Sequence, residues 1–283
     1  MLNGCAYILT VDVGNTFIRF GLFAEDSAAA QECPLATCEI TTPSSITADE
    51  ARMRLVQVMG ALAADAGMPG TLVPAAAVLS CVVPALERPW KVALSRTCTG
   101  RVLTVGPGLK TGMPVHYDDP AEIGPDRIAD AVAARAVYGS PCIVIDLGTT
   151  TNIEVIDAHG TFVGGVIAPG LALGARSLSA AAARLPQVEP SAPTHVIGRN
   201  TREAMRSGVV LGEVARIDGM LDMVLAEMRA TKAAGEGSVP IVITGDDAEA
   251  LAALVGHSLT VDDALTLRGL AELYHINQKP RRA

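Results

Sequence analysis

The chain has 283 residues, of which 49% are apolar, and a net charge of −8. This length and composition suffice for one large or two medium domains with cores of their own. The charge balance excludes a basic face for nucleic acid or anionic membranes, because lysines and arginines are scattered and the basic cluster at 279–282 is expected to be a solvated tail. No apolar run approaches the ~20 residues that span a bilayer.

The N-terminus and the cysteines both favour a cytoplasmic location. The first ten residues lack the basic segment and the cleavage site of a signal peptide. The cysteines show no C-x-x-C spacing and mostly fall in apolar patterns, so we expect reduced core thiols. A metal site formed by Cys33 and Cys38 is an alternative, although no partner pair lies nearby. The six cysteines are Cys5, Cys33, Cys38, Cys81, Cys98 and Cys142.

Hydrophobic periodicity predicts three leading strands in the first half, followed by alternating helices and strands. Thr47 and Glu50 form a capping-box pattern at the start of the first helix. The expected elements are strands at 7–13, 17–24 and 35–41, a helix at 47–66, a strand at 76–83, a helix behind Pro84, a strand at 101–105 and a helix at 126–138.

The second half repeats this scheme, which suggests a duplication with one extra helical insertion. A long helix capped by Asn200 or Thr201 is the expected insertion. The other elements are strands at 142–147, 152–158 and 161–167, a helix at 172–184, a strand at 240–244, and helices at 247–255 and 263–276.

Each half begins with a tight turn that carries an acid, a glycine and a hydroxyl. The first follows Asp12 and the second follows Asp146. A single turn of this kind is typical of a β-hairpin. Two of them indicate more, because such turns expose backbone N–H groups that can cradle an anion. An acid at the edge of the turn repels phosphate, so we expect it to hold a cation or its waters, as phosphoryl transfer requires.

A third constellation stands at the start of the predicted helix at 126–138. A helix N-terminus favours anions, and Arg127 offers a bidentate fork for a carboxylate. Asp126 is then either the N-cap or a functional base. Asp130, one turn further on, is expected to be solvated or paired with Arg127.

These motifs occur together in one known family. The segments DVGNT, YDDPAEIGPDR, DLGTT, GGVIAPGL, RNTREAMRSG and LTLRGLAELYHIN follow one another in this order. Their sequence resembles the type III pantothenate kinases, a branch of the acetate/sugar kinase–actin superfamily. The resemblance implies an α/β fold of duplicated ribonuclease H-like domains with a nucleotide cleft between them. It places the domains at 1–121 and 122–283, the second with the helical insertion and a last helix able to pack back on the first.

The resemblance also implies the reaction. The primary alcohol of pantothenate attacks the γ-phosphate of ATP to give 4′-phosphopantothenate, the first committed step toward coenzyme A. Asp126 resembles the proton acceptor, and Asp146 resembles the ligand of a monovalent cation, K⁺ or NH₄⁺, while Mg²⁺ accompanies ATP. The implied enzyme is a homodimer. The implied ATP contacts are Asp12, Val13, Gly14, Asn15, Thr16, Phe17, Ile18, Arg19 and Thr149, and the implied pantothenate contacts are Tyr117, Gly124, Pro125, Asp126, Arg127 and Thr201.

Two departures from the family pattern leave alternatives open. The turn after Asp146 reads GTTTN where the family has GTATT, and Asp246 stands where the family has a glycine that allows close approach to the nucleotide. A non-catalytic accessory member of the family is therefore one alternative. A sugar or acetate kinase is another, but it would not carry the segment from Tyr117 to Arg127.

Overall fold

The computed structural model describes residues 6–26, 32–68 and 72–278, which form two compact units. The first unit combines the residues before Ser140 with those from Ala264 onward, and the second is Ser140–Asp263. Cys5 and the basic segment at 279–282 lie outside the described residues. None of the described helices is both long and apolar enough to cross a membrane.

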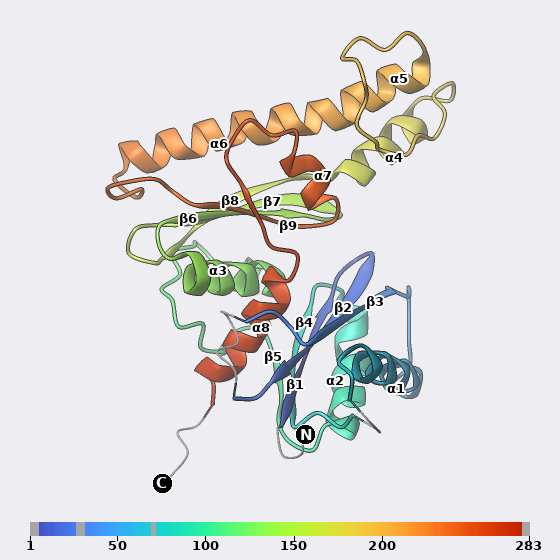
Figure 1. The fold of residues 1–283 in the computed structure, drawn as a ribbon, viewed down its shortest axis with the longest axis vertical. Coiled ribbons are helices and arrows are strands. Elements are labelled where there is room, and N and C mark those ends of the chain that lie inside the picture. The colour runs from blue at the N-terminus through green and yellow to red at the C-terminus, as the bar shows by residue number, and fades with distance from the viewer. Residues whose placement is uncertain (1–5, 27–31, 69–71, 279–283) are drawn as a thin grey trace. The chain divides into compact units, whose positions relative to one another are not determined.

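The first unit is a five-stranded mixed sheet with helices on both faces (Figure 1). The strand order is β3-β2-β1-β4-β5, in which β1, β2 and β3 are antiparallel neighbours and β4 and β5 continue parallel to β1. Its elements are β1 (Tyr7–Val13), β2 (Phe17–Ala24), β3 (Ala36–Thr41), α1 (Ala48–Asp65), β4 (Ala76–Cys81), α2 (Pro84–Thr97), β5 (Val102–Thr104), the 3₁₀ turn η1 (Pro120–Glu122), α3 (Pro125–Tyr138) and α8 (Leu265–Ile276).

Alternation along β1 divides the side chains between the two faces of this sheet. Leu9, Val11 and Val13 enter the core beneath α1 and α2. Thr10 faces the other way, toward α8, since a Cβ added at Gly21 would meet both the Thr10 hydroxyl and the side chain of Leu267. Asp12 shares the face of Thr10 and lies at the end of the strand.

The helix α3 belongs to the first unit, so the chain divides after Gly139 rather than at the expected 121/122. It packs on α8, which in turn packs on β1 and β4. The two helices cross so closely that a Cβ at Gly269 would overlap the carbonyl of Ala129. The last helix therefore packs on the first unit through both α3 and the sheet, and this pairing of distant segments has no local signal in the sequence.

The second unit repeats the topology of the first. Its sheet has the order β10-β9-β6-β7-β8, so that in each unit the first strand lies between the second and the fourth. The duplication inferred from the sequence is confirmed at the level of topology. Its elements are β6 (Cys142–Leu147), β7 (Thr150–Ile156), β8 (Phe162–Pro169), α4 (Leu171–Ala181), α5 (Thr201–Arg206), the π-helical segment η2 (Ser207–Leu211), α6 (Gly212–Ala230), β9 (Ile241–Gly245), α7 (Ala248–Ala252) and β10 (Thr260–Val261).

The expected long helix in this unit is divided into three parts. Asn200, not Thr201, is its cap, and the Asn200 side chain accepts a hydrogen bond from the Glu203 amide at 3.0 Å. The five π-helical residues of η2 then separate α5 from α6. Val214, Ile217 and Leu221 of α6 pack against the sheet. One π turn rotates the following residues relative to an α-helix, which sets the face that α6 presents.

Most of the other predicted boundaries move by only a few residues, and the capping box of Thr47 and Glu50 is present. The strand β10 was not predicted, because it has only two residues. The described cysteines are free thiols, but Cys33 is exposed, so the expectation that it is a core thiol is wrong.

Candidate functional site

The turn after β1 is held by backbone hydrogen bonds and by the end of β3. The Gly14 amide donates to the Phe17 carbonyl at 3.0 Å. Thr42, just beyond β3, donates from its hydroxyl to the Gly14 carbonyl at 2.8 Å and from its amide to the Thr16 carbonyl at 2.9 Å. Asn15 and Thr16 are exposed at the tip. The turn is thus a fixed loop whose tip is open to a ligand.

Asp12 lies beside this turn in a buried position. Its side chain is 7% exposed, and its Oδ1 atom has no hydrogen-bond partner among the described residues. Its register partners are Arg19 on β2 and Ser80 on β4. Arg19 is held in place by an ion pair with Glu39 at 3.0 Å. An unsatisfied buried carboxylate oxygen is costly and calls for a cation or another donor.

Asp126 occupies the second position of α3, and Gly124 is the N-cap. The hypothesis that Asp126 is the N-cap is therefore wrong. Its Oδ1 accepts from the Arg127 amide at 2.8 Å. A Cβ at Gly124 would overlap this carboxylate, so the glycine leaves room for it. Burial, the largest effect, raises the pKa of Asp126, and the hydrogen bond from the Arg127 amide opposes that rise.

The two acids act on each other electrostatically. Burial and then the negative charge of Asp126 raise the pKa of Asp12 to about 6, while Ser80 and Arg19 lower it. A pair of neighbouring carboxylates, one of which has an unpartnered oxygen, suits a hard cation such as Mg²⁺, which takes oxygen ligands. A raised pKa also suits a carboxylate that accepts a proton near neutral pH.

The neighbouring charged residues of α3 are buried in the helix packing. Arg127 is 5% exposed and Asp130 is 0% exposed. The expectation that Asp130 is solvated is therefore wrong, whereas the alternative that it pairs with Arg127 stays a prediction. Tyr117, which precedes η1, is half-buried.

The second turn, after β6, is also held by its own backbone. The Gly148 amide donates to the Thr150 carbonyl at 2.9 Å, and the Gly170 amide donates to the Thr149 carbonyl at 3.0 Å. A Cβ at Gly170 would overlap the Gly148 carbonyl, so β8 approaches the turn as closely as only glycine permits. Asp146 is half-buried beside this turn.

The segment after β9 adjoins the same acid. Gly245 is the register partner of Leu147, and its φ of +90° and the overlap of any Cβ with the Leu147 carbonyl require glycine. A Cβ there would also lie 2.8 Å from Oδ1 of Asp146. The Asp246 amide donates to the Leu147 carbonyl at 2.6 Å. Asp246 therefore stands one residue from the closest approach to Asp146.

A buried polar network supports the second turn and was not predicted. Glu213 on α6 is 4% exposed and accepts from the Thr151 hydroxyl at 2.6 Å. Arg216 donates to Glu213 and also to the Pro169 carbonyl. The network joins β7, β8 and α6 behind the turn. One sequence signal could have indicated this network: Glu213 stands among Val210, Val214 and Ile217, on the apolar face of a helix.

The structure therefore gathers the predicted site residues into two groups, one in each unit. Asp12, Arg19 and Asp126 come together in the first, and Asp146 and Thr149 share the second turn. Val13 and Ile18 have fully buried side chains, so only their backbone groups are available to a ligand. Thr201 is exposed at the start of α5. The described residues include no cluster of three or more acidic, histidine or cysteine side chains that could hold a metal.

A comparison with protein families decides the assignment. A family model described as type III pantothenate kinase matches residues 8–223, which include both turns and all of α3. The chain belongs to the type III pantothenate kinase family. It is thus an enzyme of the kinase class, and the family recognised from the sequence motifs is confirmed.

Relatives match along nearly the whole chain. A protein named type III pantothenate kinase from Koribacter versatilis is 37% identical over 282 residues, covering 97% of either chain. A type III pantothenate kinase 2 from Symbiobacterium thermophilum is 39% identical over 274 residues, covering 96% of this chain and 97% of the relative.

Solved structures share the fold at low sequence identity. A Campylobacter jejuni chain of the Baf family has a TM-score of 0.57 and 18% identity, covering 95% of this chain and 98% of its own. A ROK hexokinase from Thermus thermophilus has a TM-score of 0.51 and 13% identity, and the match covers 96% of this chain and 100% of the hexokinase chain. The expected fold class, α/β with duplicated ribonuclease H-like domains, is confirmed.

Proposed function

We propose that the chain transfers the γ-phosphoryl group of ATP to the primary alcohol of pantothenate, giving 4′-phosphopantothenate and ADP. The observation that carries this proposal is the pair formed by Asp12, which is buried, and Asp126, which is half-buried, two carboxylates whose pKa values are both raised. The family assignment supplies the substrate class, since the relatives are named for pantothenate.

Asp126 is the proposed proton acceptor. The pantothenate oxygen forms a bond to the γ-phosphorus, the bond from that phosphorus to the β,γ-bridging oxygen breaks, and the hydroxyl proton passes to the Asp126 carboxylate. Burial favours the protonated form of this acid, which matches the task of a base. Arg127, Tyr117 and the N-terminus of α3 are the proposed partners of the pantothenate carboxylate and hydroxyl groups.

The first turn is the proposed contact for ATP phosphate oxygens, through the exposed N–H groups around Asn15 and Thr16. Arg19, fixed by Glu39, adds a positive charge on the same face of the sheet as Asp12. Asp12 would hold Mg²⁺ or its waters through its unpartnered Oδ1. When bound, Mg²⁺ neutralises the charge that develops on the phosphate oxygens.

The second turn is the proposed site of the monovalent cation, K⁺ or NH₄⁺, with Asp146 as its charged ligand and Thr149 as an ATP contact. The Asp146 carboxylate and the backbone carbonyls of the adjacent tight turn would supply the oxygen ligands of this cation. We further propose that the enzyme is a cytoplasmic homodimer in which Thr201 contributes to pantothenate binding.

A steady-state kinase assay tests the proposed function. ADP release should depend on pantothenate, and glucose, N-acetylglucosamine and acetate should not replace it. Potassium should increase the rate over sodium at equal ionic strength. Release of ADP with a sugar or acetate but not with pantothenate would assign another kinase reaction. No phosphoryl transfer to any acceptor would favour the accessory alternative.

A further inference from the structure

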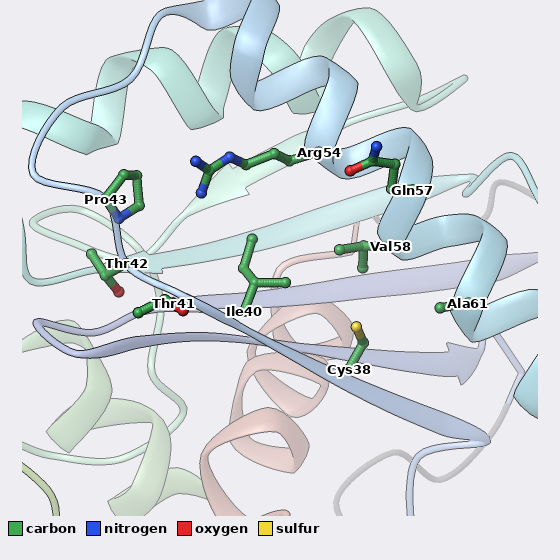
Figure 2. Close-up of a pocket in the computed structure, with 9 residues that line it drawn as sticks. All are labelled: Cys38, Ile40, Thr41, Thr42, Pro43, Arg54, Gln57, Val58 and Ala61. Carbon is green, nitrogen blue, oxygen red and sulfur yellow. The ribbon is translucent and has the colours of Figure 1, made fainter.

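A groove that the proposed reaction does not use lies between β3 and α1 in the first unit. Its volume is about 510 Å³, within the range of small-molecule sites. Its floor is on the face of the sheet that carries Val11 and Val13, opposite the face of Asp12. The lining residues, shown in Figure 2, are Cys38, Ile40, Thr41, Thr42, Pro43, Arg54, Gln57, Val58 and Ala61.

The groove combines an apolar floor with one charged group. Ile40, Val58 and Ala61 supply the apolar surface, and no lining residue is acidic. Arg54 extends from α1 toward the end of the groove formed by Pro43 (Figure 2). The nearby Glu50 is engaged by the capping box, where it accepts from the amide and the hydroxyl of Thr47 at 2.8 Å each. Glu50 keeps its negative charge and interacts electrostatically with Arg54, but of the two only the guanidinium lines the groove, where it can pair with an anion.

One wall of the groove is also the support of the first turn. Thr42 lines the groove and makes both hydrogen bonds that hold the carbonyls of Gly14 and Thr16. A ligand that shifts Thr42 must shift those carbonyls, since a hydrogen bond of 2.8 Å tolerates little displacement. Thr42 therefore connects the groove to the turn through these two hydrogen bonds.

We propose that this groove binds a small amphipathic anion and that its occupancy changes the affinity of the first turn for ATP. The carboxylate or phosphate head group pairs with Arg54 at the end of the groove formed by Pro43. The short apolar tail lies over Ile40 and Val58. Binding is independent of the proposed function, whereas the effect on ATP rests on it.

Equilibrium dialysis with radiolabelled octanoate, in the absence of ATP and pantothenate, tests the binding step. Wild type should bind about one octanoate per chain. Arg54→Gln should bind it about 2–5-fold more weakly, as expected for loss of a partly exposed ion pair. Arg52→Gln is the matched control, because Arg52 lies exposed on the same helix but does not line the groove. Ala61→Glu, which adds a negative charge to the floor, should also weaken binding.

Competitors distinguish the head groups. Octyl phosphate that displaces octanoate more effectively would identify a phosphate ligand, and weaker displacement would identify a carboxylate. Octanol should displace poorly. Equal binding by wild type and Arg54→Gln, or displacement by octanol as effective as by unlabelled octanoate, would overturn the proposal.

The fluorescence of Trp90, the single tryptophan, offers a second readout of binding. The Trp90 ring is 5.7 Å from the Phe20 ring between centroids, and Phe20 is the register partner of Cys38, which lines the groove. The Trp90 fluorescence should therefore change when octanoate binds.

The effect on ATP is tested with Thr42→Val. This variant loses the hydrogen bond from the Thr42 hydroxyl to the Gly14 carbonyl but keeps the hydrogen bond from the backbone amide of residue 42 to the Thr16 carbonyl. Saturating octanoate should change the KM for ATP at least twofold in wild type and not in Thr42→Val, although this variant still binds octanoate. If octanoate leaves the KM for ATP of wild type unchanged, or changes it equally in both proteins, the proposed effect of the groove on ATP affinity is overturned. Whether the groove binds octanoate is still decided by the dialysis experiment.

Discussion

Asp126 at the start of α3 raises the pKa of Asp12 at the end of β1, although the two acids are far apart in the sequence. Burial is the larger cause, and together they bring the pKa of Asp12 to about 6. Asp12 is thus ionised at neutral pH but loses its charge within reach of mild acid. A cation or phosphate group bound here therefore depends on pH through Asp12.

The raised pKa of Asp12 predicts that ionising this acid lowers the free energy of unfolding as the pH rises. Because the pKa of Asp12 rises from 3.8 to about 6 on folding, the native state binds the proton of Asp12 more tightly than the unfolded state does. The stabilisation that this proton gives is complete below pH 3.8 and is lost as the pH rises through 6. The free energy of unfolding of Asp12→Asn should therefore exceed that of wild type by an amount that grows from pH 4 to pH 7. The upper limit is about 3 kcal/mol, from ~1.36 kcal/mol per pKa unit.

Urea unfolding of wild type and Asp12→Asn at pH 4, 5, 6 and 7 measures this difference. Asp65→Asn, which removes an exposed acid from the end of α1, is the control and should differ little from wild type at any pH. A difference between wild type and Asp12→Asn that stays constant with pH would contradict the assigned pKa.

Asp126→Asn should abolish most catalysis without affecting folding. An amide cannot accept the hydroxyl proton, and base catalysis contributes on the order of 10²–10⁴-fold, so we expect a loss of at least ~10²-fold in kcat. Because Gly124 is the N-cap of α3, the substitution does not remove a helix cap. Single-turnover kinetics with ATP binding measured separately checks this, with exposed Asp118→Asn as control. A near-wild-type kcat would leave the base unidentified.

Local patterns were sufficient to predict most elements and both turns. The runs around Asp12 and Asp146 alternate with the period of a strand, and each ends in glycine and hydroxyl residues that specify a turn. Thr47 and Glu50 likewise define their helix start within four residues. These features are set by neighbours in the sequence, so the sequence alone contains the information.

Features set by distant contacts could not be predicted in this way. The position of Asp130 depends on the crossing of α3 with α8, which only Gly269 makes possible. The network of Glu213 depends on how η2 rotates α6 onto β7. The N-cap of α3 was misplaced because Asp126 is a good capping residue, whereas Pro125 at the first helical position moves the cap to Gly124.

Asp146→Ala should remove the response to potassium. Asp146 lies beside the second turn, where a Cβ at Gly245 would come within 2.8 Å of its Oδ1 atom. We expect the ratio of kcat/KM in KCl to that in NaCl to fall close to one in the variant. Glu249→Ala, an exposed acid on α7, should retain the wild-type ratio. An unchanged ratio in Asp146→Ala would exclude this acid as the cation ligand.

Asp246→Gly should lower the KM for ATP by about 3–10-fold, because a carboxylate that crowds or repels the bound nucleotide costs on the order of 1 kcal/mol. The substitution keeps the amide that donates to Leu147. Asp247→Gly is a matched control, since it removes an adjacent negative charge from a residue with φ of +58° that glycine adopts readily. The KM for pantothenate should stay constant in both. A KM for ATP that is unchanged or higher in Asp246→Gly would show that Asp246 does not hinder the nucleotide.

The segment before α5 has the most exposed apolar side chains of the second unit. Ile197 is 83% exposed and Val196 is 73% exposed, and the Val196 carbonyl is fixed by a hydrogen bond from Ser207 at 2.5 Å. We place the contact of the proposed dimer at these two neighbouring exposed side chains. Since Thr201 follows within four residues, a dimer formed here would place the partner chain beside a proposed pantothenate contact.

Ile197→Glu should therefore convert a dimer to a monomer, because a carboxylate buried in an apolar interface is costly. Light scattering after size exclusion measures the mass, and the KM for pantothenate should rise as the dimer dissociates. Met53→Glu is the control, since Met53 is 61% exposed on α1 in the first unit and its substitution should leave the mass unchanged. A dimer that persists in Ile197→Glu, or that dissociates equally in Met53→Glu, would place the interface elsewhere.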